Sequence, residues 1–303
     1  MSDKLESPFV YFGGKKRVAG FIWSKFGNPY YYLEPFCGSA AVLLARNWKG
    51  NGVEILNDYN CFLCNFWRSV KYKPDETLFY ADYPISHADL TVRHQFLVDN
   101  ENALRESIMS NDEYCNAKLA GYWVWCVNCW IGSGLGTVTK TGKVSDQIPH
   151  TIHRNGIFAR KNSDLKKVFD NLTCRLKSVI LLCGDWKRGL KTKSILNSDC
   201  AVFLDPPYCR KISGSKKTYL NENEGLSKEV ENWCIENENV CKIVVAGYDG
   251  EHTVLENRGW GVHSWSTCGG FKNQNKTKNN DNRLKERLWY NNLCNKTPLL
   301  GDM

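Results

Sequence analysis

Short apolar runs that each end near an acid are the feature that most constrains this fold. Four such runs occur, at residues 30–33, 53–58, 179–183 and 201–204, and the acids at or just after their ends are Glu34, Asp58, Asp185 and Asp205. Short apolar runs bounded by polar or small residues are typical of buried strands. Helical patterns lie between them, so the sequence predicts an α/β protein with a doubly wound sheet. Ligands of such sheets bind just beyond the carboxyl ends of the strands, which is where the acids lie.

The four residues after the last of these runs, Asp205-Pro206-Pro207-Tyr208, carry the strongest chemical signal. Proline has no N–H, so the carbonyls at this point remain as acceptors. Asp205 and the carbonyl of Pro206 can accept two hydrogen bonds from one –NH2 group, and Tyr208 offers a flat face to a planar ring. Two such bonds localise the lone pair of the amine and make it nucleophilic. The motif favours a clamp for an aromatic amine such as adenine N6 or cytosine N4. The alternative interpretation is a strand-terminating turn with a solvated aspartate.

Asp-Pro-Pro-Tyr resembles the catalytic motif of S-adenosylmethionine-dependent amino-methyltransferases that act on DNA. The order of the other motifs resembles the Dam-like or D12 class of adenine-N6 DNA methyltransferases, and the resemblance covers residues 8–60 and 178–265. It implies a Rossmann-like methyltransferase sheet of seven mixed strands with an inserted, mostly helical target-recognition domain. It divides the chain into a catalytic domain, residues 1–60 and 172–303, and an insert, residues 61–171.

Three local patterns in the first 60 residues are suited to binding a cofactor. Two glycines precede Lys15 and allow a close approach of the backbone. A strand, a turn at Gly38 and a helix predicted from Ala41 to Trp48 follow, and such a unit places helix N–H groups beside a ligand. Asp58 lies about 20 residues past the turn, where an acid accepts hydrogen bonds from ribose hydroxyls. Its alternative role is to cap the next helix, and one aspartate can fill both roles.

The resemblance adds specific roles in binding S-adenosylmethionine. It implies that Tyr11 packs on the cofactor, that Lys15 contacts its carboxylate end, and that Asp185 and Trp186 hold its adenine. The loop from Glu34 resembles Glu-Pro-Phe-x-Gly-Ser-Gly, and it departs from that pattern at Ala40. The residues predicted to bind the cofactor are Tyr11, Lys15, Glu34, Pro35, Phe36, Gly38, Ser39, Asp58, Asp185, Trp186 and Asp205.

The net charge of +8 is concentrated in two segments, residues 136–167 with +5 and residues 269–287 with +4. The remainder of the chain has a net charge of −1. This concentration favours contact with a polyanion, and a pair of solvated loops is the alternative. Gln, Arg and Asn read base edges in the major groove, and the resemblance implies a basic, Gly-rich recognition hairpin in the insert. The residues predicted to bind DNA are Lys140, Lys143, Gln147, His150, Arg154, Asn155, Lys272 and Lys276.

These features together predict transfer of a methyl group from S-adenosylmethionine to the N6 amine of an adenine flipped out of double-stranded DNA. The residues predicted to carry catalysis are Asp205, Pro206, Pro207 and Tyr208. Cytosine N4 or RNA as the substrate stays an alternative, as does a DNA-binding protein without turnover. A dinucleotide-binding oxidoreductase is disfavoured, because the glycine spacing lacks GxGxxG. We expect a monomer or weak dimer. No endonuclease-like second domain is visible, so we also expect an enzyme of the solitary, phage or viral type.

Fourteen cysteines are scattered through the chain. The N-terminus lacks the apolar region of a signal peptide, so we expect reduced thiols in a cytoplasmic protein. The pairs Cys61/Cys64 and Cys126/Cys129 have CxxC spacing, which zinc sites use. Their apolar, helix-like surroundings favour core thiols instead, and no metal is predicted. No apolar run approaches 18 residues, so no membrane span is predicted either.

Overall fold

The computed structural model describes residues 5–9, 11, 13–47, 50–130, 132, 134–139, 142, 144–150, 162–208, 225–265 and 286–296. Seven strands within these residues form one sheet: β1 Tyr31–Glu34, β2 Val53–Asp58, β3 Val179–Cys183, β4 Cys200–Leu204, β5 Lys242–Tyr248, β6 Gly261–Ser264 and β7 Glu286–Tyr290. Their order is β3-β2-β1-β4-β5-β7-β6. The first five strands of that order are parallel, whereas β7 is antiparallel to both of its neighbours. The predicted mixed Rossmann-like sheet is confirmed.

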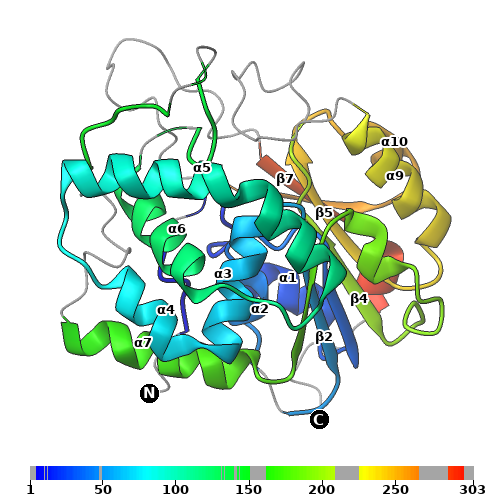
Figure 1. Ribbon diagram of the computed structural model, residues 1–303. Helices are drawn as coiled ribbons and strands as arrows, with labels where there is room; N and C mark the ends of the chain where they lie inside the picture. The colour runs from blue at the N-terminus through cyan, green and yellow to red at the C-terminus, as the bar shows by residue number, and fades with distance from the viewer. Residues whose placement is uncertain are drawn as a thin grey trace.

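Helices cover both faces of the sheet. They are α1 Ala19–Phe26, α2 Ala41–Leu44, α3 Cys61–Tyr72, α4 Pro74–Ala81, α5 His87–Ser110, α6 Ala117–Cys129, α7 Asn162–Leu176, α9 Leu226–Asn237 and α10 Thr253–Asn257, with 3-10 helices η2 Trp186–Leu190 and η4 Asn292–Lys296. In Figure 1, α3 to α6 lie on one side of the strands and α9 and α10 on the other. No described helix is both long and apolar enough to cross a membrane.

Strand β4 lies at the centre of the molecule, and all five of its residues are buried. Phe203 packs into the core on the side of α3 and α6, whereas Val202 and Leu204 pack into the core on the side of α9. An uninterrupted apolar run is typical of a parallel strand that helices cover on both faces. Two packed layers therefore hold the end of β4, and with it Asp205, in place.

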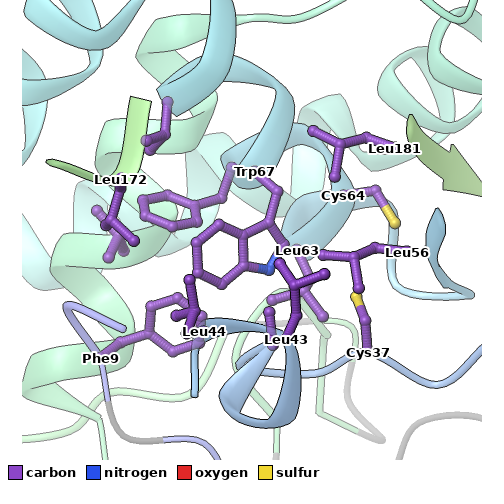
Figure 2. Packing of buried hydrophobic residues seen from close by; sticks show 14 of the residues in the cluster. Phe9, Cys37, Leu43, Leu44, Leu56, Leu63, Cys64, Trp67, Leu172 and Leu181 are labelled. Carbon is purple, nitrogen blue, oxygen red and sulfur yellow. The ribbon is translucent and has the colours of Figure 1, made fainter. Parts of the chain in front are cut away.

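The helical segment that follows β2 shares a core with the sheet. Trp67 of α3 is 1% exposed, and its indole lies among Phe9, Leu44 and Leu172 in Figure 2. Its Nε1 donates a hydrogen bond to the carbonyl of Gly38 at 3.1 Å, so the helix also holds the loop after β1. The limit predicted between residues 171 and 172 falls inside α7. The division into a catalytic domain and an insert stays a prediction.

The tryptophans of α6 and its C-terminal end belong to the core. Trp123 and Trp125 are 3% and 0% exposed, and Trp130 just beyond the helix is 5% exposed. Arg93 of α5 lies over the rings of Tyr83, Tyr122 and Trp125, at 4.4 to 4.7 Å from their centroids. A cation over aromatic faces is stabilised by the ring quadrupoles. The contact therefore fastens α5 to α6.

Helix α2 is shorter than the sequence predicts. Helix was expected as far as Trp48, but α2 ends at Leu44 and residues 45–47 leave the helix. There the side chain of Arg46 turns inward, and its Nη1 donates to Oε1 of the buried Glu54 at 3.0 Å. Arg175 of α7 donates to both oxygens of the same carboxylate, at 2.6 and 2.8 Å. This buried Arg–Glu–Arg group fastens α7 to β2.

Candidate active site

Five parallel strands direct their carboxyl ends to the same edge of the sheet. β4 lies between β1 and β5, so the residues that follow each of these strands are neighbours although they are far apart in sequence. This arrangement brings Asp205 together with residues from the N-terminal loop and from the end of β5.

Asp205 forms an ion pair with Lys15. Nζ of Lys15 lies 2.8 Å from Oδ2 of Asp205, and it also donates to the carbonyl of Gly13 at 2.6 Å. The side chains are 4% and 20% exposed. The predicted role of Lys15 was to contact the carboxylate end of a cofactor. The structure shows that this ammonium also lies against the carboxylate of the Asp-Pro-Pro-Tyr motif.

Tyr208 completes the contacts of that carboxylate. Its hydroxyl donates to Oδ1 of Asp205 at 3.2 Å, and Nζ of Lys15 lies 5.2 Å from the centroid of its ring. Each Asp205 oxygen therefore accepts one of these bonds. An ionised carboxylate offers about four lone-pair positions, so the group retains acceptor capacity for an amine. Pro206 is buried and Pro207 half-buried between these two residues.

The charge state of Asp205 is set by opposing effects. Burial raises its pKa above the ordinary value, while the charge of Lys15 and the hydrogen bonds from Lys15 and Tyr208 lower it. The carboxylate of Glu251 adds a smaller effect that raises the pKa. Because a buried carboxyl with no partner becomes neutral, Lys15 favours the ionised form of Asp205.

Asp58 holds the loop after β1. Its Oδ2 accepts from the backbone N–H of Gly38 at 3.0 Å, and its Oδ1 accepts from the N–H of Asn60 at 3.0 Å. Gly38 has a φ of 47°, and a Cβ at this position would lie 2.9 Å from Cδ1 of Tyr11. The side chain that caps α3 is Asn60, not Asp58. The alternative interpretation of Asp58 as the cap of that helix is therefore wrong.

Ala40 explains why glycine suits this place in the loop. Its φ of 51° and ψ of 29° are left-handed, and among the described residues it is the one non-glycine with a positive φ. A left-handed residue with a Cβ costs roughly 1–2 kcal/mol. Ser39 before it is buried, and its Oγ would lie 3.5 Å from a Cβ placed on Gly14. The two glycine-containing loops therefore approach each other closely.

Glu34 is directed into the protein. Its Oε2 accepts from the hydroxyl of Tyr32 at 3.0 Å and from the backbone N–H of Leu43 at 3.2 Å. Burial raises the pKa of Glu34 to about 8, although these two hydrogen bonds lower it. Its contacts thus join the end of β1 to α2.

Asn57 ties the loop after β1 to the loop after β3. Its Nδ2 donates to the carbonyls of Pro35 and Gly184, both at 3.1 Å. The ring of Phe36 from the first loop stacks on Trp186 from the second, with centroids 5.8 Å apart and planes at 22°. The side chain of Asp185 is exposed and caps η2 by accepting from the N–H of Lys187 at 2.9 Å. Each predicted residue of these two loops lies at the same edge of the sheet.

Two of the eight residues predicted to bind DNA lie within the described part of the chain. Gln147 and His150 are half-buried, and the backbone N–H of His150 donates to the carbonyl of Cys129 at 2.9 Å. Val138 and Val144 form an isolated antiparallel β-bridge in this segment. Six of the predicted residues lie outside the described residues: Lys140, Lys143, Arg154, Asn155, Lys272 and Lys276.

The CxxC cysteines lie in two helices. Cys61 and Cys64 belong to α3, Cys126 and Cys129 belong to α6, and all four are buried. Burial raises the pKa of Cys61 and of Cys129 to about 12. The described residues contain no group of three or more His, Cys, Asp or Glu side chains arranged to hold a metal ion.

Two residues of the site have no role in the sequence predictions. Asn57 precedes Asp58 and gave no signal, because an amide at a strand end has many uses. Tyr248 ends β5, and its ring contacts that of Tyr208. The signal that could have identified Tyr248 is an aromatic residue just beyond an apolar run, the same signal that Tyr208 gives.

Comparison with known proteins agrees with this geometry. The family described as D12 class N6 adenine-specific DNA methyltransferase matches residues 11–232. The chain is also 27% identical over 220 residues to the Type II methyltransferase M.MjaIII of Methanocaldococcus jannaschii, covering 66% of this chain and 68% of that protein. The family match supports methylation of adenine in DNA. The family match spans both the Lys15 loop and the Asp-Pro-Pro-Tyr motif, so the chain belongs to the D12 class of N6 adenine-specific DNA methyltransferases.

Proposed function

We propose that this chain transfers the methyl group of S-adenosylmethionine to N6 of an adenine extruded from double-stranded DNA, with Asp205, Pro206 and Tyr208 as the residues that bind the base. The observation that carries the proposal is the carboxylate of Asp205, held between Lys15 and Tyr208 at the end of β4. A base inside a duplex cannot reach such a group, so the adenine must leave the stack.

The residues of the motif bind and orient the amine. Asp205 and the carbonyl of Pro206 each accept one hydrogen bond from the N6 amine, and the ring of Tyr208 stacks on the adenine. These contacts hold the N6 lone pair in one direction and localise it on nitrogen. Proximity and electrostatic stabilisation of this kind supply most of the rate enhancement in many enzymes. A strong general base is not required for the attack itself.

The loops after β1, β2 and β3 suit a nucleoside-containing sulfonium cofactor. Gly38 has no room for a Cβ beside Tyr11, so glycine at this position lets the Tyr11 ring lie against the loop that is proposed to bind the cofactor. Asp58 provides carboxylate oxygens for ribose hydroxyls, and Phe36 and Trp186 provide an aromatic pair beside Asp185. When bound, S-adenosylmethionine supplies an electrophilic methyl group. The negative charge of Asp205 also favours a positively charged sulfonium nearby.

The test is methylation of duplex DNA by the purified chain, followed by mass spectrometry of the nucleosides. We expect N6-methyladenine from the wild-type chain and a loss of at least about 100-fold in kcat for Asp205→Asn, a size typical of removing one key electrostatic contact. Single-molecule sequencing of the product would give the sequence context of the modified base.

Asp199→Asn is the matched control, since Asp199 is exposed and precedes the opposite end of β4. It should retain wild-type activity, and both variants should keep the wild-type melting temperature within a few degrees. N4-methylcytosine as the product, or Asp205→Asn at the wild-type rate, would refute the proposal.

A further inference from the structure

The side chain of Tyr248 packs on the ring that is proposed to stack with the base. The centroids of the Tyr208 and Tyr248 rings are 4.6 Å apart, with an angle of 68° between their planes. This is an edge-to-face contact, the arrangement that the quadrupoles of two aromatic rings favour. Both residues are half-buried.

The fold produces this contact, because 40 residues separate the two tyrosines. β4 and β5 are adjacent and parallel, and Leu204 is paired with Val245 in register. Tyr208 follows Leu204 by four residues and Tyr248 follows Val245 by three. Both rings therefore leave the sheet at the same edge.

Tyr248 is itself firmly held. Its backbone N–H donates to Oε2 of Glu251 at 2.9 Å, and the N–H of Glu251 donates back to its carbonyl at 2.9 Å. Ser227 of α9 donates to the other oxygen of Glu251 at 2.7 Å. A Cβ at Gly247 would lie 3.0 Å from Oε2 of Glu251, so this glycine lets the carboxylate approach. The end of β5 is thus a rigid support for the Tyr248 ring.

Three described contacts constrain the ring of Tyr208. Its hydroxyl donates to Asp205, Nζ of Lys15 lies 5.2 Å from its centroid, and the ring forms an edge-to-face pair with that of Tyr248. The hydrogen bond fixes the position of the hydroxyl, whereas the contact with Tyr248 bears on the plane of the ring. An edge-to-face pair is favourable only over a limited range of angles, so this contact favours one orientation of the Tyr208 ring.

We propose that Tyr248 is a positioning residue that fixes the plane of the Tyr208 ring for stacking with the extruded adenine. This inference rests on the proposed function, since it assigns Tyr208 the base as its partner. Tyr248 touches neither the amine nor the cofactor in this scheme, and it acts through Tyr208 alone.

The experiment is a double-mutant cycle with Tyr208→Ala, Tyr248→Leu and the two combined. Loss of an edge-to-face contact should lower kcat of Tyr248→Leu by about 2- to 12-fold. Tyr248→Phe keeps the ring and should recover the wild-type rate. In the Tyr208→Ala background, Tyr248→Leu should have no further effect, since neighbouring residues that act through one group are not additive.

A second readout follows the base directly. 2-Aminopurine at the target position is quenched by its neighbours in the duplex, so its fluorescence should rise on extrusion, and stacking on Tyr208 should limit that rise. Tyr248→Leu should give a larger rise than the wild type, a change that a merely structural role would not cause. Tyr30→Leu is the control, because Tyr30 forms a similar edge-to-face pair with Tyr31, at 4.9 Å and 75°, at the opposite ends of the strands.

The possible outcomes separate the two proposals. Absence of adenine methylation by the wild-type chain would refute the proposed function. Wild-type methylation with equal losses from Tyr248→Leu in both backgrounds, or with unchanged 2-aminopurine fluorescence, would refute the positioning role alone.

Discussion

The ammonium of Lys15 lies 2.8 Å from the carboxylate of Asp205, although 190 residues separate them in the chain. The resemblance to the family implied a role for Lys15 at the cofactor, and an ammonium with three donors can contact more than one acceptor. Its contact with Asp205 places a positive charge on the group proposed to bind the amine. The N-terminal loop is therefore expected to influence the base as well as the cofactor.

Lys15→Met should make activity more sensitive to acid. Lys15 lowers the pKa of Asp205, so its removal should raise that pKa further. If ionised Asp205 binds the amine, the activity should then be lost at a higher pH than in the wild type as the pH falls. The measurement is kcat/KM for DNA as a function of pH. Lys16→Met should leave the profile unchanged, because Lys16 pairs with Glu6 near the surface. An unshifted acid limb in Lys15→Met would contradict the prediction.

Glu34→Gln should stabilise the protein at alkaline pH relative to the wild type. The pKa of Glu34 is raised to about 8 in the folded state from 4.5. A raised pKa means that the folded state favours the neutral carboxyl of Glu34. The contribution of this carboxyl to the free energy of unfolding is therefore complete below about pH 4.5 and is lost as the pH rises towards 8. Glutamine is neutral throughout. The difference in free energy of unfolding between Glu34→Gln and wild type, from urea titrations between pH 5 and 8.5, should therefore grow with pH. A constant difference would show that Glu34 does not titrate in this range.

Gly38→Ala should weaken cofactor binding and destabilise the fold. Its φ of 47° is left-handed, and the new Cβ would meet the Tyr11 ring at 2.9 Å. We expect a loss of about 1–2 kcal/mol from the backbone and a further loss of affinity for S-adenosylmethionine, measured by urea unfolding and titration calorimetry. Gly50 has a φ of 84°, and a Cβ added there would meet no atom within 4 Å, so Gly50→Ala is the control. It should lose stability without losing affinity, and equal affinity for both variants would contradict the predicted role of the loop.

Glu54→Gln should destabilise the protein strongly. The substitution removes the charge shared by Arg46 and Arg175 and leaves two buried guanidinium groups without it. Breaking a buried ion pair from one side costs about 3–5 kcal/mol. The check is the free energy of unfolding from urea titration. Glu229→Gln removes half of a surface pair with Lys187 and should cost less than about 1 kcal/mol. Similar losses of unfolding free energy in both variants would show that the buried Arg–Glu–Arg group stabilises the protein no more than a surface ion pair does.

The strands were predictable because their apolar runs have clear limits. β2 and β3 begin and end where the sequence indicates, since polar or glycine residues bound each run. The contacts that build the site were not predictable. Lys15 meets Asp205, and Tyr248 meets Tyr208, only because β4 lies between β1 and β5, and one sequence does not specify that order.

Local patterns also failed where a distant partner decided the structure. The helix expected after Ala41 stops early, and there Arg46 reaches Glu54 on the next strand. Asn60 rather than Asp58 caps α3, because Asp58 is engaged by the N–H of Gly38. In both cases an interaction across the fold prevailed over the local preference of the chain.

The amide of Asn57 has a consequence for selectivity. One Nδ2 group donates to carbonyls on both flanking loops, so this side chain, with the strand ladder below it, fixes the spacing between those loops. A molecule lying across both loops must match that fixed width. Analogues lengthened between their two ends would then be rejected by shape, even where every polar group they carry has a suitable partner.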